Sequence, residues 1–333
     1  MLRTRSPAVF GGYAGAKLRG AAASLLAVAF TGFFIFRVLP GDPVRTITRG
    51  RPVSAAQLAA LRHTFGLDKP LVVQFGDYLL RLAHGDLGVS YQYRTPVLRL
   101  VLDHLAATVY LVGSATLVAA VLGLWLGARS AWRRGSTSDR VHTAIALTLW
   151  SVPSFWLGLI LIVVLAVGVG PVPGVFPTGG ISGVGVSGLL PVLADRLGHL
   201  ALPCLTLVAI LYAQYLLIMR SSLLDEMGED YLTTARAKGL RDAEIRRRHA
   251  VPNALLPAVT LVFLQLGTAV SGAVLVEAIF SWPGLGSLFY QAVGVPDLPL
   301  LQGLFLVFSA SVIVMNLLAE LAYPLLDPRV RGG

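Results

Sequence analysis

Charged side chains are scarce in this chain of 333 residues, of which only 13% are Asp, Glu, Lys or Arg while 55% are hydrophobic. Water-soluble domains carry about 25% charged residues, so a soluble globular fold is excluded. The mean hydropathy is +0.73, and the long apolar runs lack the alternating polarity of barrel strands. Because a bilayer admits only segments whose backbone hydrogen bonds are satisfied, these runs indicate spanning helices. The sequence predicts an all-α, polytopic membrane protein.

Cysteine and clustered histidine are also lacking. Cys204 is the only cysteine and lies in an apolar segment, which excludes an intrachain disulfide and a thiolate metal site. The six histidines are scattered without the spacing of metal ligands. We therefore expect no metal site.

Nucleotide-binding and nucleic-acid-binding signals are absent as well. No GxxxxGK[ST] motif occurs, so we do not expect the chain to bind ATP through a P-loop. The net charge of +10 is not accompanied by a basic patch with interleaved aromatic residues, which argues against nucleic acid. Arginines on the cytoplasmic side of a membrane protein explain this charge better.

One short motif is typical of an enzyme. Residues 185–188 read GVSG and match the GxSG segment around the nucleophile of rhomboid-type intramembrane proteases. Such an enzyme needs a histidine on a later membrane helix to accept the serine proton, and the expected fifth and sixth spans contain none. We therefore expect no catalytic residues.

Six apolar segments predict six transmembrane helices. They cover residues 21–36, 105–128, 141–167, 199–219, 257–279 and 300–323. Gly123 and Gly127 are four residues apart, the spacing that lets two helices approach closely. Pro153 predicts a kink in the third span. The first span lacks a small-residue cleavage pattern, so we interpret it as an uncleaved anchor and not a signal peptide.

Basic residues predict the topology. The N-terminus, the second and fourth links and the tail together hold 17 Lys and Arg, whereas Arg196 is alone in the short outer links. This asymmetry predicts that both termini are cytoplasmic. We expect residues 1–39 to form the cytoplasmic N-terminus and first span, residues 40–104 an external subdomain, and residues 105–333 the core.

A charged segment at residues 220–257 interrupts the apolar sequence with 13 of the 44 charged side chains. Its first part predicts an amphipathic helix. The stripe on one face of that helix consists of Leu224, Met227, Tyr231, Ala235 and Lys238. Gly239 predicts a turn, and Asp242 a cap for a second helix. We interpret the segment as a contact surface; the alternative is a solvated loop that anchors the chain beside the membrane.

Polar side chains within the expected spans are costly and therefore mark candidate path-lining groups. For Ser and Thr, including Thr268 and Ser271, hydrogen bonds to their own helix explain the polarity. The candidates for a translocation path are Gln214, Gln265 and Asn316, with bridging of neighbouring helices as the alternative. Glu277 and Glu320 lie near span ends, where we expect a carboxylate to reach water or a lipid headgroup.

The charged segment contains YLTTARAKGL and then RRRHAVPNALLP, with a small-residue triplet at Thr233, Thr234 and Ala235 and a glycine, Gly239, four residues after it. This pattern resembles the coupling loop of ABC-importer permeases. Val251 and Pro252 form the closing pair. The triplet begins with threonine where the general pattern has glutamate.

Further motifs resemble the B-type permease subunit of dipeptide, oligopeptide and nickel importers. In chain order they are PGDP at 40–43, FGLDKPL at 65–71, GDLGVS at 85–90, FPTGG at 176–180, VEAIFSWPGLG at 276–286 and LLDPRVR at 325–331. Together they extend over nearly the whole chain.

The resemblance implies a type I importer permease fold in the bacterial cytoplasmic membrane. It also implies the partners: a second permease subunit, two cytoplasmic ATP-binding subunits and an external substrate-binding lipoprotein or periplasmic protein that docks on residues 40–104. ATP and Mg²⁺ would then bind to the ATP-binding subunits, and this chain would bind no cofactor. The expected substrates are peptides or a related small solute, nickel included.

The resemblance also implies roles for individual residues. A helix from Glu229 to Lys238 would dock on an ATP-binding subunit, with Tyr231 and Ala235 against an apolar wall and Arg236 and Lys238 near acidic groups. Residues 276–286 would lie at the external gate, which includes Glu277, Pro283 and Gly284.

A stand-alone secondary transporter is the alternative, favoured by the six spans and the intramembrane amides. Such proteins usually have two similar halves or ionisable groups at the bilayer midplane. Neither is evident in this sequence.

Overall fold

The computed structural model describes residues 7–38, 54, 56–57 and 68–326; within these, the side chains of residues 7–13, 37–38, 268–272 and 323–326 are not described. The motifs at 40–43 and 65–67, the tail from residue 327 and the Thr268 and Ser271 side chains therefore lie outside the description.

Within the described residues, four helices are long and apolar enough to cross a membrane. They are α1 (Pro7–Val38), α5 (Val97–Trp132), α8 (Leu189–Glu226) and α15 (Leu298–Leu326). Two bent pairs qualify when each pair is counted as one span, which gives up to six spans among the described residues. The only strands there are β1 (Gly168–Val169) and β2 (Val172–Pro173). The all-α prediction is confirmed.

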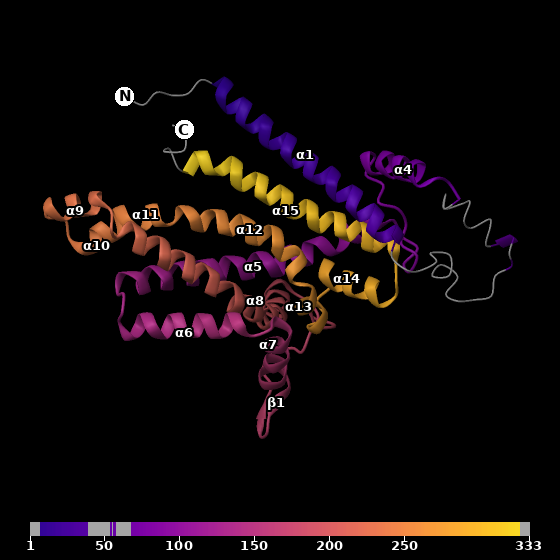
Figure 1. The fold of residues 1–333 in the computed structure, drawn as a ribbon. Helices are drawn as coiled ribbons and strands as arrows, with labels where there is room; N and C mark the ends of the chain where they lie inside the picture. The colour runs from indigo at the N-terminus through magenta and orange to yellow at the C-terminus, as the bar shows by residue number, and fades with distance from the viewer. Residues whose placement is uncertain (1–6, 39–53, 55, 58–67, 327–333) are drawn as a thin grey trace.

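The first bent pair covers the expected third span, residues 141–167. Helix α6 (Thr137–Ser151) is followed by Val152, whose backbone is extended, as is usual before proline. Pro153 then caps α7 (Ser154–Leu161), which continues into a π-helix, η1 (Ile162–Val167). The two halves meet at 100°, so the bend at the expected proline is far larger than a kink. Helix α7 and the β1–β2 hairpin project sideways from the bundle (Figure 1).

The second bent pair connects the charged segment to the fifth apolar run. Short helices α10 (Asp242–Ile245) and α11 (Val251–Ala254) are joined by a π-helix, η2 (Arg246–Ala250). They meet α12 (Leu256–Gly272) at 46°.

Helices α5 and α8 form the centre of the bundle. A Cβ atom on Gly123 would lie 2.6 Å from the carbonyl oxygen of Tyr212, and one on Gly127 would lie 2.5 Å from that of Leu216. Only glycine permits such an approach of two backbones, so the predicted close contact is confirmed. Ala115, Ala119, Tyr215 and Leu216 are fully buried along this seam.

The remaining helices cover this pair. Helix α15 lies between α1 and α12 (Figure 1). Helix α4 (Leu71–Ala83) packs Phe75 against Phe33 of α1, with ring centroids 5.3 Å apart. The start of α1, the end of α15 and α9 (Asp230–Ala237) lie at the same end of the molecule.

Two helices are longer than the spans expected within them, because the spans were bounded by their apolar residues alone. Helix α5 begins at Val97 and α8 at Leu189, well before residues 105 and 199. Residues 280–299, the link between the expected fifth and sixth spans, contain α14 (Leu285–Gly294), and α13 (Val274–Ile279) precedes it after a break at Ala273.

The close approach of α5 and α8 predicts the effect of a single methyl group. Gly127→Ala should lower the unfolding free energy in detergent by about 1–3 kcal/mol, because the new Cβ overpacks the seam. Gly113→Ala is the matched control, since nothing lies within 4 Å of its Cβ position; there the better helix propensity of alanine should be neutral or stabilising. Equal effects of the two substitutions would contradict this packing.

Candidate functional site

Helix α9 is the exposed helix of the charged segment. Glu229 is its N-cap and Lys238 its C-cap. Gly239 follows with a φ of +79°, a conformation that glycine adopts without strain. The predicted order of helix, glycine turn and second helix is confirmed.

The second helix begins differently from the expectation. Arg241 occupies the N-cap position with extended backbone, and no side chain caps α10. Asp242 is the first helical residue, and its carboxylate lies 3.8 Å from Nε of Arg236. The prediction that Asp242 is the cap was therefore wrong.

One face of α9 is buried on the chain's own helices. Leu232 is 0% and Ala235 7% exposed. The two residues are three apart and therefore lie on the same side of the helix. They belong to a cluster that we call the α9 cluster, which joins α5, α8, α9, α10, η2 and α11. Its members are Ala131, Met219, Leu223, Leu232, Ala235, Ile245, Ala250 and Ala254.

Tyr231 also points toward the chain and not outward. Its hydroxyl group donates to Oε2 of Glu226 at 2.5 Å and accepts from Nδ2 of Asn253 at 2.9 Å. It thereby links the ends of α8 and α11. The expectation that Tyr231 and Ala235 contact a partner does not fit these positions, because both are engaged within this chain.

The other expected residues are exposed. They are Glu229, Thr233, Thr234, Arg236 and Lys238 of α9 and its caps, and Pro252 at the start of α11. With the exposed Asp230, the α9 helix and its caps present two basic groups, two carboxylates and two hydroxyl groups, and the α9 cluster lies beneath them.

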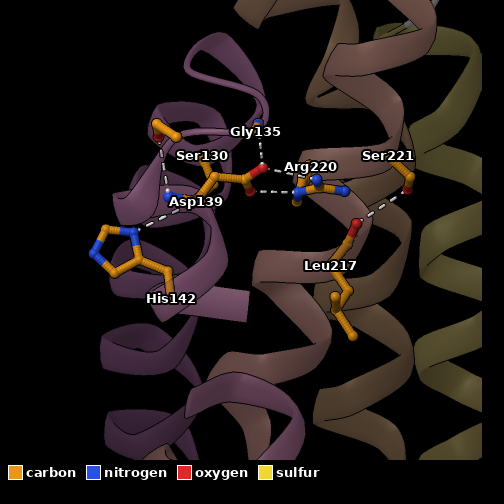
Figure 2. Close-up of polar contacts among 8 residues, drawn as sticks. Ser130, Gly135, Asp139, His142, Leu217, Arg220 and Ser221 are labelled. Carbon is orange, nitrogen blue, oxygen red and sulfur yellow. Dashed lines mark hydrogen bonds and ion pairs between the residues drawn. The ribbon is translucent and has the colours of Figure 1, made fainter. Parts of the chain in front are cut away.

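An ion pair between a buried carboxylate and a partly buried guanidinium fixes the end of α8 that leads into α9. Nε and Nη2 of Arg220 donate to the two carboxylate oxygens of Asp139 at 2.7 and 3.0 Å (Figure 2). The Asp139 side chain is only 4% exposed, and the Gly135 amide also donates to it at 3.0 Å. Ser136 Oγ accepts from the Asp139 amide and caps α6. The pair therefore clamps α6 to α8.

Sequence reasoning missed this ion pair, although a signal was present. Ser136 and Asp139 are spaced as in a capping box, and Asp139 is the only acid in a link with four arginines. A second polar contact lies nearby, between Ser130 Oγ and Nδ1 of His142 at 3.2 Å (Figure 2). Both contacts join helix ends at the same level of the bundle.

The intramembrane amides are only partly brought together. Gln265 of α12 donates from Nε2 to Oε1 of Gln214 on α8. Asn316 is half-buried on α15. The contact between the two glutamines bridges two helices, and their role in a path stays a prediction.

Glu277 is fully buried, so the expectation that it reaches water or a headgroup was wrong. One carboxylate oxygen accepts from Oγ1 of Thr108 at 2.8 Å, and the other from the amides of Gly286 and Ser287 at 2.7 and 3.1 Å. Thr108 Oγ1 accepts from the Leu285 amide at 2.7 Å. The first three amides of α14 are therefore capped by side chains from α5 and α13.

The rest of the expected gate region surrounds this carboxylate. A Cβ on Gly284 would lie 2.3 Å from Oε2 of Glu277, so only glycine fits at the N-cap of α14. Pro283 is exposed. Nε1 of Trp282 donates to the carbonyl oxygen of Ala107 at 2.9 Å. Glu320, in contrast, is exposed and pairs with Lys17 at 2.8 Å.

The GDLGVS motif is attached to the same end. Ser90 Oγ and the Gln92 amide donate to Oδ2 of the buried Asp297 at 2.5 and 2.9 Å. The hydroxyl group of Tyr93 donates to Oε1 of Gln291 at 2.7 Å. Burial and the nearby Asp297 carboxylate raise the pKa of Tyr93 further above neutral pH. The loop before α5 is thus fixed to α14 and α15.

Comparison with known proteins shows similarity over nearly the whole chain. The family described as "Binding-protein-dependent transport system inner membrane component" matches residues 90–332. A family of N-terminal membrane components of such systems matches residues 15–112. Both matches include residues outside the structural description.

Individual relatives are also similar to this chain over most of its length. The dipeptide transport system permease protein DppB of Escherichia coli (strain K12) is 37% identical over 92% of this chain and 95% of its own length. The glutathione transport system permease protein GsiC of Salmonella choleraesuis (strain SC-B67) is 35% identical over 95% of this chain and 97% of its own. The di/tripeptide transport system permease protein DppB of Pseudomonas aeruginosa (strain UCBPP-PA14) is 38% identical over 91% and 94%.

The Asp139–Arg220 pair predicts a thermodynamic coupling. Asp139→Asn should lower the unfolding free energy by about 3 kcal/mol, because it leaves a partly buried guanidinium without its counterion. The double variant Asp139→Asn/Arg220→Gln should lose less than Asp139→Asn alone. Asp103→Asn, in the exposed Arg99–Asp103 pair, is the control and should change stability by less than about 0.5 kcal/mol. Strict additivity of the two single substitutions would contradict the clamp.

Proposed function

Because this chain belongs to the family of binding-protein-dependent transport system inner membrane components, we propose that it is the membrane-spanning permease subunit of an ATP-driven importer. The relatives named above transport dipeptides, di- and tripeptides, and glutathione. These are all short peptides, so short peptides are the proposed substrate class.

The proposal requires partner subunits. The sequence contains no P-loop, so ATP and Mg²⁺ would be bound by two ATP-binding subunits on the cytoplasmic side. A second permease subunit would complete the path across the membrane, and an external binding protein would deliver the substrate.

The observation that carries the coupling role is the support beneath α9. A contact helix transmits force only if it is attached to the spans, and the α9 cluster attaches this one to α5 and α8. The Asp139–Arg220 pair adds α6. Thr233, Thr234, Arg236 and Lys238 are left exposed for an ATP-binding subunit. Arg236 and Lys238 would approach its acidic groups.

Movement of α9 would then shift several helices together. The buried side chains between α9 and the spans are closely packed and leave little freedom for independent motion. ATP-driven closure of the two ATP-binding subunits would therefore tilt the attached helices as a rigid body and switch the direction of opening. At the other end, the capped helix α14 and the loop fixed by Asp297 would move with α5 and α15.

A cross-linking experiment tests the proposed docking face. The single cysteine makes this simple: in a Cys204→Ser background, Thr234→Cys places one thiol on the exposed face of α9. We expect a short thiol-reactive cross-linker to join it to an ATP-binding subunit in membranes that contain the assembled transporter. Arg134→Cys, exposed at the end of α5, is the matched control and should give at least fivefold less product. Equal yields would contradict docking through α9.

The same proposal predicts the source of ATP hydrolysis. The purified chain alone should hydrolyse no ATP above the rate of a buffer blank, because it lacks a P-loop. Adding the ATP-binding subunits should restore hydrolysis, and substrate-loaded binding protein should stimulate it. Phosphate release measured from the isolated chain, with mass spectrometry to verify that no ATP-binding subunit is present, would contradict the proposal if it exceeded the blank.

A further inference from the structure

A groove between α5 and the second half of the charged segment is separate from the proposed coupling surface. It has a volume of about 750 Å³ and lies between the end of α5 and the segment from Arg241 to Leu255. Leu124, Trp125 and Ala128 of α5 form one wall, with Val251 and Leu255 opposite them. The groove is thus apolar on the side toward the spans.

Its rim is strongly basic. The arginines that line it are Arg129, Arg241, Arg246, Arg247 and Arg248. Glu244 is the one acidic residue in the lining, and it pairs with Arg248 at 2.8 Å. The Arg246 guanidinium lies over the ring of Trp132, 5.9 Å from its centroid. The groove therefore carries a positive charge that its single carboxylate does not balance.

Three of these arginines are positioned for an external anion. Arg129, Arg241 and Arg247 are exposed, and no ion pair to them occurs within the described part of the chain. Guanidinium groups bind phosphate oxygens through paired hydrogen bonds. An anion in the groove would be approached from both α5 and the charged segment.

A row of exposed apolar side chains, which we call the apolar track, continues from the groove along the surface of α5, toward the middle of that helix. Leu117, Val121 and Trp125 are 66%, 61% and 62% exposed. They are spaced four residues apart on α5, so they lie in a line along one side of the helix for about 12 Å. Trp125 stands at the boundary between this track and the arginines, the position that Trp prefers at a membrane interface.

We propose that this groove binds an anionic phospholipid. The phosphate and headgroup would contact Arg129, Arg241 and Arg247, and an acyl chain would lie along Leu117, Val121 and Trp125. The two halves of the groove match the two halves of such a lipid, and the topology predicted from basic residues places the arginines at the anionic cytoplasmic leaflet. The inference goes beyond the proposed function and does not depend on the transported substrate.

A lipid fits these observations better than an acidic protein segment. An acidic partner in the cytoplasm would account for the arginines but not for the exposed track that continues into the bilayer. A free phosphate ion would likewise leave the apolar wall unused. The three occupants are distinguished by lipid retention, competition with glycerol phosphate and protein binding.

The experiment measures lipid retention by native mass spectrometry. The full-length chain, purified in detergent, is titrated with phosphatidylglycerol or phosphatidylcholine in mixed micelles, and separately with glycerol phosphate. The test variant is Arg241→Gln/Arg247→Gln. The matched control is Arg133→Gln/Arg134→Gln, which removes the same charge from exposed arginines outside the groove. A second variant, Trp125→Ala, tests the acyl track.

We expect the wild-type chain and the control to retain phosphatidylglycerol at least fivefold more than phosphatidylcholine. The test variant should lose this preference, Trp125→Ala should reduce retention of both lipids, and glycerol phosphate should not compete. Equal retention in the test and control variants would overturn the proposal. Full competition by glycerol phosphate would overturn it in favour of a headgroup-sized anion. If the test variant keeps its lipid retention but, with purified ATP-binding subunits added to the same sample, no longer binds them, the proposal is overturned in favour of a protein occupant.

Discussion

The close packing of α5 against α8 is the constraint on which the other contacts of this chain depend. Gly123 and Gly127 bring the two backbones so near that even a methyl group would meet a carbonyl oxygen. In a bilayer, where lipid tails are as apolar as leucine, such tight contact is a main source of helix association. It places the end of α5 beside the end of α8, where the α9 cluster and the Asp139–Arg220 pair form.

Polar side chains then fix each end of this central pair. At one end, the Asp139 carboxylate clamps α6 to α8 through Arg220. At the other, the Glu277 carboxylate and Thr108 cap α14 against α5. Both carboxylates are buried with several donors each, which an apolar environment demands. A force applied at α9 would therefore act on helices that are joined to one another at both ends of the α5–α8 pair. Such a framework suits a permease that switches between two states.

Local patterns allowed part of this structure to be predicted. The glycine pair, the bend at Pro153 and the turn at Gly239 follow from backbone properties of single residues, and family motifs predicted a helix at residues 229–238, where α9 lies. Burial was harder, because it depends on partners far away in sequence. Glu277 has its donor 169 residues away in Thr108, and Arg220 has its counterion 81 residues away in Asp139. The inward position of Tyr231 depends on one near and one more distant partner, since its hydroxyl group donates to Glu226, five residues away, and accepts from Asn253, 22 residues away.

The central claim is that α9 moves with the spans as one body, and a distance measurement within this chain tests it most directly. Spin labels on Thr234→Cys of α9 and Thr137→Cys of α6, in a Cys204→Ser background, report their separation by pulsed electron paramagnetic resonance in the assembled transporter. The distance distribution should be unchanged between nucleotide-free and ATP-bound states, while a label pair that joins the two permease subunits shifts in the same preparation. A shift of the Thr234–Thr137 distribution on ATP binding would contradict the account.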